Sequence, residues 1–384
     1  ELLCTKLCEV EIVHGGEDLL ARTILEGREL NVPVMFVLTA CGPEIVGDDI
    51  EAVCEDLRAE VDFELVPVQS AGFRGDQNWG TDLALQAVIE QLVPARAAAD
   101  KRPHSVCLIA PHGNANPTWM GDLAWTRDVL LRMGATDVVN LTHDTTLEDL
   151  ARVSQCEACL VLSHDAGQQA ADDLAAQFEV EQWCKGLPLP VGFTHTRNWL
   201  AELGRRLGAE EAARKLIAEG ESWVVQTCRR KGLQQSAMHR APAAIVADAT
   251  VGVPLLRFVC EDLEVVPQLV CLRSGQEGTR QMLARELDDL ALKPEVVYGA
   301  DVYQARTALA GMHLEMVLGS NIERHAVRDL GIPYVFRLVT PVSSFRLTDR
   351  AYWGYRGILN LIEIVQNEWW DRYRSKRQRY KARW

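Results

Sequence analysis

The sequence predicts an α/β fold made of parallel βαβ units, and three observations support this prediction. Short apolar runs, typical of buried strands of about four to eight residues, recur along the whole chain. Between them lie longer segments whose apolar residues repeat with helical spacing. Strand, loop and helix follow one another in this order, which is the pattern of parallel sheets. The chain of 384 residues is long enough for several domains, and we predict three Rossmann-like domains at residues 1–100, 101–225 and 226–384.

The composition is that of an ordinary globular protein, and it excludes some functions. Hydrophobic residues make up 48% of the chain and charged residues 24%. The net charge of -14 argues against general nucleic-acid binding, because phosphates would be repelled. No apolar run approaches the roughly 20 residues that span a bilayer, and no secretory segment is recognisable. The 11 cysteines form no regular framework, which is typical of reduced thiols, so we expect a cytoplasmic protein.

The expected elements follow in chain order from local patterns. In the first domain we expect strands at residues 34–38 and 63–68, and helices at 17–29, 50–61 and 82–92. In the second we expect strands at 105–110, 137–141 and 160–163, and helices at 119–133, 147–153, 167–178 and 200–227. In the third we expect strands at 243–248, 265–272, 296–298, 316–319 and 334–336, and helices at 253–262, 276–290 and from 354 onward. The helical region 200–227 is expected to break near Gly208 and Gly220, and residues 94–103 resemble a linker.

Cys41 is the residue around which the functional prediction is built. It follows the expected strand 34–38 at the carboxyl edge, where open α/β sheets bind ligands. We expect the next helix to begin near residues 47–48, so that a thiolate at Cys41 would face a helix amino terminus. The alternative is that Cys41 is a small apolar residue packed beneath a turn. No GxGxxG motif occurs in the chain, so no nucleotide site is predicted.

Three motifs, in the right order, resemble one protein family. The sequence CGPEIVGDDI at residues 41–50 is similar to the segment with the third cluster-ligating cysteine in the catalytic component of nitrogenases. Upstream, VHGGEDL at residues 13–19 resembles the Val-Phe-Gly-Gly helix start of that family. Downstream, VPV at 66–68 and GFRG at 72–75 resemble its next strand and glycine loop. The family normally has a longer amino-terminal region with two further cluster cysteines, so we expect the first domain to be truncated at its N-terminus.

The resemblance also indicates which of the family's two homologous subunits this chain is. The α-type chain of nitrogenase holds the active-site cofactor through one cysteine and one histidine, and LVLSHD at residues 160–165 resembles that cysteine's position without containing a cysteine. The segments MVLGSN at 316–321, GIPY at 331–334 and GYRG at 354–357 resemble the β-type chain. We therefore expect a β-type subunit.

The resemblance implies a shared iron–sulfur cluster and a second candidate ligand. Cys41 would be a thiolate ligand of a cluster shared with an α-type partner, either an 8Fe-7S P-cluster-like centre or a 4Fe-4S cluster. In the β-type chain of nitrogenase, a serine after the Phe-x-Gly turn can bind a cluster iron, and here Asp76 follows that turn. A carboxylate suits oxidised iron, so Asp76 is a candidate ligand. Its alternative role is to cap the next helix.

Other candidate metal groups carry less weight. Cys156 and Cys159 form a CxxC pair without a second pair, and Cys159 begins an apolar strand. Cys4 and Cys8 are four residues apart and would share a helix face. Four histidines lie at or near strand ends in different βα units, and we expect core or loop roles for His112, His143, His164 and His195.

Two further features are interpreted without a catalytic role. Residues 163–165 read Ser-His-Asp, but adjacent residues cannot form a hydrolase triad. The basic segment 372–383 is interleaved with aromatic residues, and it either docks on an acidic partner surface or is a solvated helix end.

The resulting hypothesis is an oxidoreductase subunit. It would be the β-type subunit of a nitrogenase-like reductase in an α2β2 heterotetramer, relaying electrons from an ATP-hydrolysing iron protein to a metallocluster held by the α-type partner. Nitrogenase proper, dark-operative chlorophyll-precursor reductases and methylthioalkane reductases that cleave carbon–sulfur bonds are candidates. Asp76 and the short, divergent loops disfavour nitrogenase proper, and we select the methylthioalkane type. The alternatives are a cofactor-assembly scaffold of the same fold and a metal-free small-molecule-binding protein.

Overall fold

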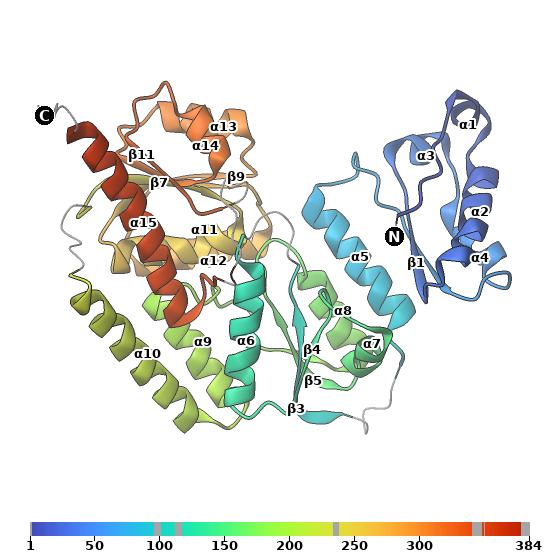
Figure 1. Cartoon of the computed structure of the whole chain (residues 1–384), viewed down its shortest axis with the longest axis horizontal. Helices are drawn as coiled ribbons and strands as arrows, with labels where there is room; N and C mark the ends of the chain where they lie inside the picture. The colour runs from blue at the N-terminus through green and yellow to red at the C-terminus, as the bar shows by residue number, and fades with distance from the viewer. Residues whose placement is uncertain are drawn as a thin grey trace, which may run out of the picture. The chain divides into compact units, whose positions relative to one another are not determined.

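The computed structural model describes residues 2–95, 101–111, 117–232, 238–339, 348 and 350–377, with side chains up to residue 370. Every strand pair in this part of the chain is parallel, and three sheets follow one another along the sequence (Figure 1). The predicted class of parallel α/β units is therefore confirmed.

The chain divides into two compact units. Unit 1 comprises Glu1–Lys101, Thr145–Gln155 and Ala166–Val180, and unit 2 comprises Arg102–Asp144, Cys156–Asp165 and Glu181–Trp384. The three domains expected at residues 1–100, 101–225 and 226–384 stay a prediction.

The first sheet has two strands and lies in unit 1. Its elements are α1 (Glu9–His14), α2 (Glu17–Glu26), η1 (Gly27–Leu30), β1 (Val34–Leu38), α3 (Cys41–Val46), α4 (Ile50–Leu57), β2 (Glu64–Val68) and α5 (Gln77–Leu92). One face of the sheet packs through Val37 and Leu65 against Ile24 of α2 and Cys54 of α4. The other face packs through Val66 and Val68 of β2 against α5. This burial on both faces is what parallel strands require.

The second sheet has the order β4-β3-β5-β6. Its elements are β3 (Arg102–Ile109), α6 (Trp119–Arg132), β4 (Asp137–Asn140), α7 (Leu147–Val153), β5 (Cys156–Val161), α8 (Gln168–Phe178), β6 (Glu181–Gln182), α9 (Gly192–Arg206) and α10 (Glu210–Arg230). The central strand β3 is fully buried over its last four residues, which explains its continuous apolar run rather than an alternating one.

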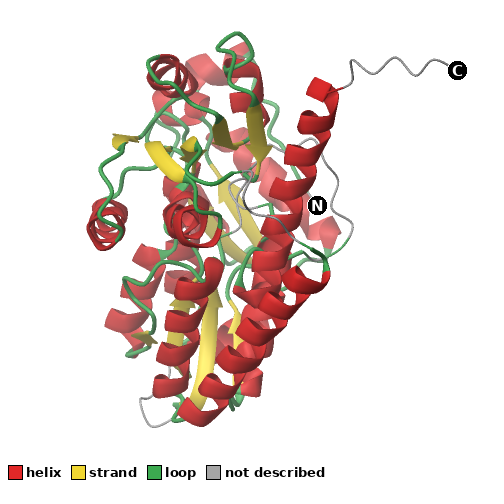
Figure 2. Ribbon diagram, turned by 90° about the vertical axis from the view of Figure 1, so that its left-hand side faces the viewer, coloured by secondary structure: helices red, strands yellow, loops and turns green. Residues whose placement is uncertain are grey.

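The third sheet has the order β11-β10-β7-β8-β9. Its elements are β7 (Pro242–Ala247), α11 (Ala249–Arg257), the π-helical turn η4 (Phe258–Asp262), β8 (Val266–Leu272), α12 (Glu277–Asp289), β9 (Glu295–Tyr298), α13 (Val302–Ala310), β10 (Met316–Gly319), α14 (Asn321–Ala326), β11 (Tyr334–Arg337) and α15 (Gly354–Arg377). The chain runs outward from β7 in one direction through β8 and β9, and in the other through β10 and β11. The topological switch point therefore lies between β7 and β10. Figure 2 shows strands lying between helices, as in a doubly wound sheet.

Two local expectations were wrong, and the structure gives the reason for each. Cys41 was expected to precede a helix beginning near residues 47–48, but it is itself the first residue of an unexpected short helix, α3, which Gly47 ends with a φ of 97° in the left-handed region. The expected helix follows as α4, from Ile50. The expected break at Gly208 is present, but α10 runs unbroken through Gly220. A Cβ at Gly220 would lie 2.0 Å from the ring of Tyr355, so this glycine allows α15 to pack closely against α10.

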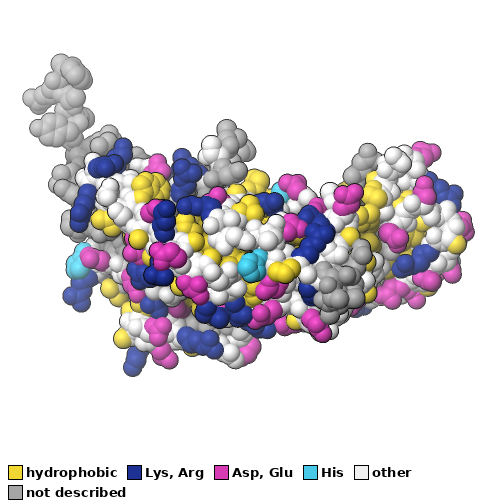
Figure 3. Space-filling model, turned by 90° about the horizontal axis from the view of Figure 1, so that it is seen from below, with side chains coloured by type: hydrophobic (Ala, Val, Ile, Leu, Met, Phe, Trp, Pro, Cys, Tyr) yellow, Lys and Arg dark blue, Asp and Glu magenta, His cyan; other side chains and the backbone are white. Residues whose placement is uncertain are grey.

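No helix in the described part of the chain is long and apolar enough to cross a membrane. The face drawn in Figure 3 carries lysine, arginine and carboxylate side chains interspersed, rather than a field of one sign.

Candidate functional site

The structure brings the motifs of the first domain together. The carboxylate of Asp48 accepts a 2.9 Å hydrogen bond from the Gly16 N–H, and Glu17 accepts one of 2.9 Å from the Asp49 N–H. A Cβ at Gly16 would lie 2.8 Å from the second oxygen of Asp48, so only glycine permits this approach without a shift. The glycine pair before α2 and the GDD segment after α3 thus form one contact, although 32 residues separate Gly16 from Asp48.

Cys41 is the first residue of the short helix α3 and has an exposed side chain. An ideal Cβ at Gly72 would lie 3.8 Å from the Cys41 Sγ, so the glycine loop after β2 passes directly beside the thiol. Because α3 has only six residues, its dipole offers little to a thiolate. The alternative in which Cys41 packs beneath a turn is excluded by its exposure.

Glu44, the fourth residue of the cysteine motif, holds this arrangement in place. Its side chain is only 5% exposed and forms a 2.5 Å ion pair with the Nε of Arg74. The same carboxylate accepts hydrogen bonds from the Thr39 hydroxyl and, at 3.1 Å, from the Ala71 N–H. The Thr39 hydroxyl oxygen accepts in turn from the Ser70 N–H at 2.8 Å. The loop after β1 and the loop after β2 are therefore joined through one buried carboxylate.

The electrostatics of Glu44 favour its charged form. Burial raises the pKa of this carboxyl, but hydrogen bonds from Thr39 and Ala71 and the Arg74 guanidinium outweigh burial and hold the pKa below its ordinary value. Glu44 is therefore ionised at neutral pH.

Three large apolar side chains on the segments next to Cys41 are exposed. Leu38 at the end of β1 is 62% exposed, Ile45 on α3 is 75% exposed and Phe73 beside Gly72 is 57% exposed. We call Leu38, Ile45 and Phe73 the apolar rim. Exposed large apolar side chains are of the kind that another protein covers at an interface.

Asp76 caps the helix that follows the glycine loop. Its carboxylate accepts a 2.9 Å hydrogen bond from the Trp79 N–H at the start of α5. The capping role expected as the alternative is thus present, and the role of Asp76 as an iron ligand stays a prediction.

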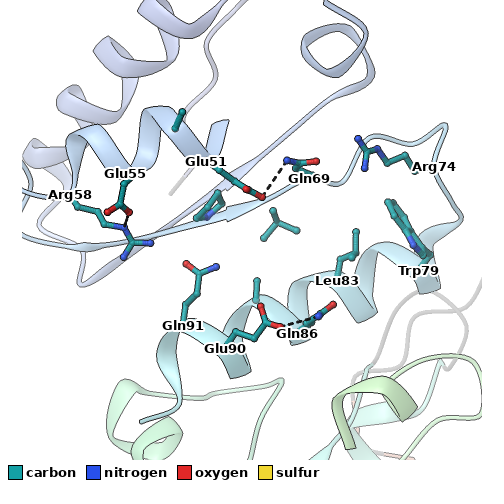
Figure 4. Close-up of a pocket in the computed structure, with 14 residues that line it drawn as sticks. Glu51, Glu55, Arg58, Gln69, Arg74, Trp79, Leu83, Gln86, Glu90 and Gln91 are labelled. Carbon is teal, nitrogen blue, oxygen red and sulfur yellow. Dashed lines mark hydrogen bonds and ion pairs between the residues drawn. The ribbon is translucent and has the colours of Figure 1, made fainter. Parts of the chain in front are cut away.

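A groove of about 630 Å³ lies between α4 and α5 beside β2 (Figure 4). Both arginines of the groove form ion pairs: Arg58 with Glu55 at 2.8 Å, and Arg74 with Glu44. The carboxylates of Glu51 and Glu90 accept hydrogen bonds from the neutral side-chain amides of Gln69, at 3.3 Å, and Gln86, at 3.0 Å. The groove touches the Cys41 region through Arg74.

The part of the chain that the structure describes does not by itself hold a complete set of ligands for a metal ion. Among the described residues, no three histidine, cysteine or carboxylate side chains lie close enough to hold a metal ion. The exposed thiol of Cys41 is the cysteine of this region that a ligand from outside the chain could reach.

The remaining cysteine candidates are explained by packing or by local structure. Cys156 and Cys159 are 1% and 0% exposed on β5 and pack in the core. Cys54 is fully buried on α4, and burial raises the pKa of its thiol to about 11. The expectation that Cys4 and Cys8 share a helix face is wrong, because α1 begins only after Cys8.

The expected core or loop roles of the histidines are confirmed where the structure describes them. His164 is half-buried, accepts a 3.1 Å hydrogen bond from the Leu189 N–H, and has its pKa lowered to about 4 by loss of solvent around the ring. His195 is 2% exposed, and its Nε2 lies 3.1 Å from a carboxylate oxygen of Glu286. His143 packs edge-on against the ring of Trp119. His112 lies outside the described residues.

The contacts that Glu44 and Asp48 make were not predicted from the sequence. Both were recognised only as parts of a motif, whereas each joins two loops that are far apart in the sequence. The signal was present in their residue type, since two acidic residues in a turn-rich segment need donors from elsewhere in the fold.

Comparisons with known proteins place residues 1–369 of the chain in one family. The family model described as nitrogenase component 1 type oxidoreductase matches residues 1–369. The chain is 28% identical over 365 residues to the nitrogenase iron-molybdenum cofactor biosynthesis protein NifE of Methanococcus maripaludis, covering 94% of this chain and 72% of that protein. It is 25% identical to the nitrogenase iron-iron protein beta chain of Rhodobacter capsulatus, covering 96% and 83%.

Two further relatives define the range of the similarity. One chain of the light-independent protochlorophyllide reductase of Bradyrhizobium sp. (strain ORS 278) is 26% identical, with 89% of this chain and 66% of that protein covered. The NifE protein of Bradyrhizobium diazoefficiens is 22% identical, and this chain spans only 64% of its length. The activities and partners of these longer proteins are therefore carried to this chain only as proposals.

The fold agrees with the sequence comparison. The solved structure described as nitrogenase Cp1 at pH 6.5 superimposes with a TM-score of 0.81 over 98% of this chain and 84% of that chain, at 16% identity. The family match confirms the predicted resemblance, and the solved structure has the same fold as this chain. This chain belongs to the nitrogenase component 1 type oxidoreductase family.

Proposed function

We propose that this chain is the β-type subunit of the catalytic component of a nitrogenase-like reductase. It shares an iron–sulfur cluster, either P-cluster-like 8Fe-7S or 4Fe-4S, with a homologous α-type partner. An ATP-hydrolysing iron protein supplies electrons, and the partner holds the metallocluster that reduces the substrate. The family match and the similarity to a nitrogenase beta chain support an oxidoreductase subunit.

The observation that carries the proposal is the exposure of Cys41 within the apolar rim. A cysteine that served only packing would be buried, as Cys54 is. A thiol that completes a shared cluster must reach the interface, and apolar side chains around it would exclude water once the partner is bound.

The residues of this chain would act by positioning. Cys41 would supply a thiolate to the cluster, which, when bound, supplies one-electron chemistry. Glu44 holds the loop of Cys41 against the glycine loop, and Gly72 leaves room beside the sulfur. Asp76 is proposed as a further oxygen ligand on the same loop, in addition to capping α5.

The narrowest form of the proposal concerns the substrate. We assign the reductase to the type that cleaves a carbon–sulfur bond of a methylthioalkane, consuming two electrons and two protons to give methanethiol and a hydrocarbon. The support is indirect: Asp76 stands where the nitrogenase β-type chain has a serine, and this departure disfavours nitrogenase proper. A nitrogenase β chain proper is the alternative within the same activity class.

The second candidate function is a cofactor-assembly scaffold. It is favoured by the relatives described as cofactor biosynthesis proteins, of which this chain covers between 60% and 72% in length. A scaffold would release its metallocluster to an acceptor protein and show no turnover of its own.

The test is anaerobic quantitation of iron and sulfide, with EPR, on the chain co-purified with its α-type partner. In Cys41→Ala we expect cluster iron to fall sharply while the complex still forms. Cys8→Ala is the matched control, because Cys8 is also an exposed cysteine of unit 1, and its iron should equal that of the wild type. Cys41→Ser keeps the side-chain size if the alanine variant fails to assemble.

Each outcome has a defined meaning. Full iron retention in Cys41→Ala removes Cys41 from the site, and no iron in any sample favours a metal-free binding protein. ATP-dependent release of methanethiol from a methylthioalkane, measured with the iron protein, supports the narrow form of the proposal. Cluster transfer without turnover supports the scaffold.

A further inference from the structure

The loop after β5 contains a dense cluster of buried polar groups. Asp165 is 2% exposed, and each of its carboxylate oxygens accepts one backbone and one hydroxyl hydrogen bond. The Ala249 N–H, at 2.9 Å, and the Ser274 hydroxyl, at 2.5 Å, donate to one oxygen. The Thr250 N–H, at 2.7 Å, and the Thr250 hydroxyl, at 2.5 Å, donate to the other.

The rest of the loop is bound to the same elements. The Ser163 hydroxyl lies 2.9 Å from the Thr250 hydroxyl oxygen, which also accepts from the His164 N–H at 3.0 Å. The Thr279 hydroxyl donates to the His164 carbonyl at 3.0 Å, and the Gln276 side chain donates to the Asp165 carbonyl at 2.8 Å. Residues 163–165 are thus held by the start of α11, the end of β8 and the start of α12.

The place that Asp165 occupies is one where doubly wound sheets take anionic ligands. Ala249 and Thr250 are the first two residues of α11, the helix that follows β7 at the topological switch point. Free N–H groups in the first turn of such a helix bind phosphate or carboxylate groups. Here those N–H groups donate to a carboxylate of the same chain.

A second internal side chain crosses the same edge of the sheet. Arg273 follows β8 and pairs with Asp248, at the end of β7, at 3.3 Å. It also pairs with Glu323, on α14 after β10, at 3.0 Å. The segments that follow β7 and β10 are therefore linked through one cation and its two carboxylates.

We propose that Asp165 is a built-in ligand that fills the anion position at the switch point of the third sheet. The Asp165 carboxylate and Arg273 together occupy the carboxyl edge of the third sheet. Asp165 also joins the loop after β5 of the second sheet to the third sheet within unit 2. The edge is therefore not a binding site for a phosphate-bearing ligand. This inference does not depend on the cluster proposed at Cys41.

The test is chemical rescue of the missing carboxylate in the full chain. Asp165→Ala leaves four donors without their acceptor, and we expect its Tm to fall by about 5–10 °C. Sodium formate should enter the vacated position and restore at least about half of that loss in a saturable manner. Formamide and sodium chloride at matched concentration should restore none of it.

Three controls make the result specific. Wild type and Asp128→Ala, which removes a 63% exposed carboxylate of unit 2, should respond equally weakly to formate and chloride. Asp165→Asn fills the position with an amide, so it should lose Tm without rescue by formate. If the alanine variant does not fold, hydrogen exchange in Asp165→Asn replaces it, and the amides of Ala249 and Thr250 should exchange at least about tenfold faster.

Two outcomes overturn the inference. One is an Asp165→Ala variant whose Tm equals that of the wild type, or whose Tm rises with formate no more than the Tm of the wild type does. The other is unchanged exchange at Ala249 and Thr250 in Asp165→Asn.

Discussion

Replacing Glu44 by glutamine removes one charge from the centre of the Cys41 region while keeping the size of the side chain. The wild-type carboxylate is 5% exposed, accepts from the Thr39 hydroxyl and the Ala71 N–H, and pairs with Arg74. The amide of glutamine keeps one acceptor oxygen, but its NH2 group would face either a donor or the Arg74 guanidinium.

The magnitude follows from these contacts. A hydrogen bond to a charged group contributes about 1.5–3 kcal/mol, more than one between neutral groups. The Arg74 side chain is 45% exposed, so solvent weakens its ion pair to about 1 kcal/mol. Because one acceptor survives, we expect Glu44→Gln to destabilise the local structure by about 2–3 kcal/mol. A change of this size corresponds to a factor of about 30–150 in an opening equilibrium.

The assay is hydrogen exchange at the amide of Ala71, which donates directly to Glu44. Exchange at this amide should be faster in Glu44→Gln by that factor, with the core of unit 2 unaffected. The pH dependence has a definite sign. Because the folded pKa of Glu44 lies below its ordinary value of 4.5, its stabilisation is present above about pH 4.5 and is lost as the pH falls through the lowered pKa.

Arg74→Ala is the matched control, since it removes only the exposed partner and should increase exchange at Ala71 by less than about tenfold. The reasoning is refuted if the amide of Ala71 exchanges at the wild-type rate in Glu44→Gln. Cluster iron should fall in Glu44→Gln as well, because the Cys41 loop would no longer be held against the glycine loop.

Two further predictions concern single residues. Burial raises the pKa of Asp262 from 3.8 to about 7, so its ionisation destabilises the fold progressively as the pH rises from about 4 to 7. Asp262→Asn should therefore gain stability over the wild type by up to about 4 kcal/mol more at pH 8 than at pH 4, measured by thermal unfolding, and a pH-independent difference would contradict this. Gly16→Ala places a Cβ 2.8 Å from Asp48 and should cost about 1–3 kcal/mol, whereas Gly42→Ala, with nothing within 4 Å, should stay within about 0.5 kcal/mol. Equal melting of the two alanine variants would show that Gly16 is not needed for this contact.

Element type and order could be predicted because the signals are local. The apolar run of β1 and the acidic first turn of α2 are read within a few residues of sequence, and both elements were found. Helix boundaries were predicted less accurately between β1 and α4, where the short helix α3 lies. The helix α3 begins at Cys41, since Pro43 and Glu44 are tolerated in a first turn and no apolar periodicity marks a helix of six residues.

For the candidate site, too, some features could be predicted from the sequence and others could not. Cys41 could be chosen from its motif and its place after a strand, but its exposure and its neighbour Gly72 come from the loop packing. Gly220 was misread as a helix break, because the ring of Tyr355 that requires a glycine there is 135 residues away in the sequence (355 − 220 = 135).

The class of parallel α/β units, the family and the position of Cys41 follow from the amino-acid sequence, because periodicity and motifs are properties of neighbouring residues. Which buried acids meet which donors is known only from the folded chain. Glu44 reaches Ala71 across 27 residues, and Asp165 reaches Thr250 across 85. Such pairs depend on the order of the strands in each sheet, and local patterns do not encode that order.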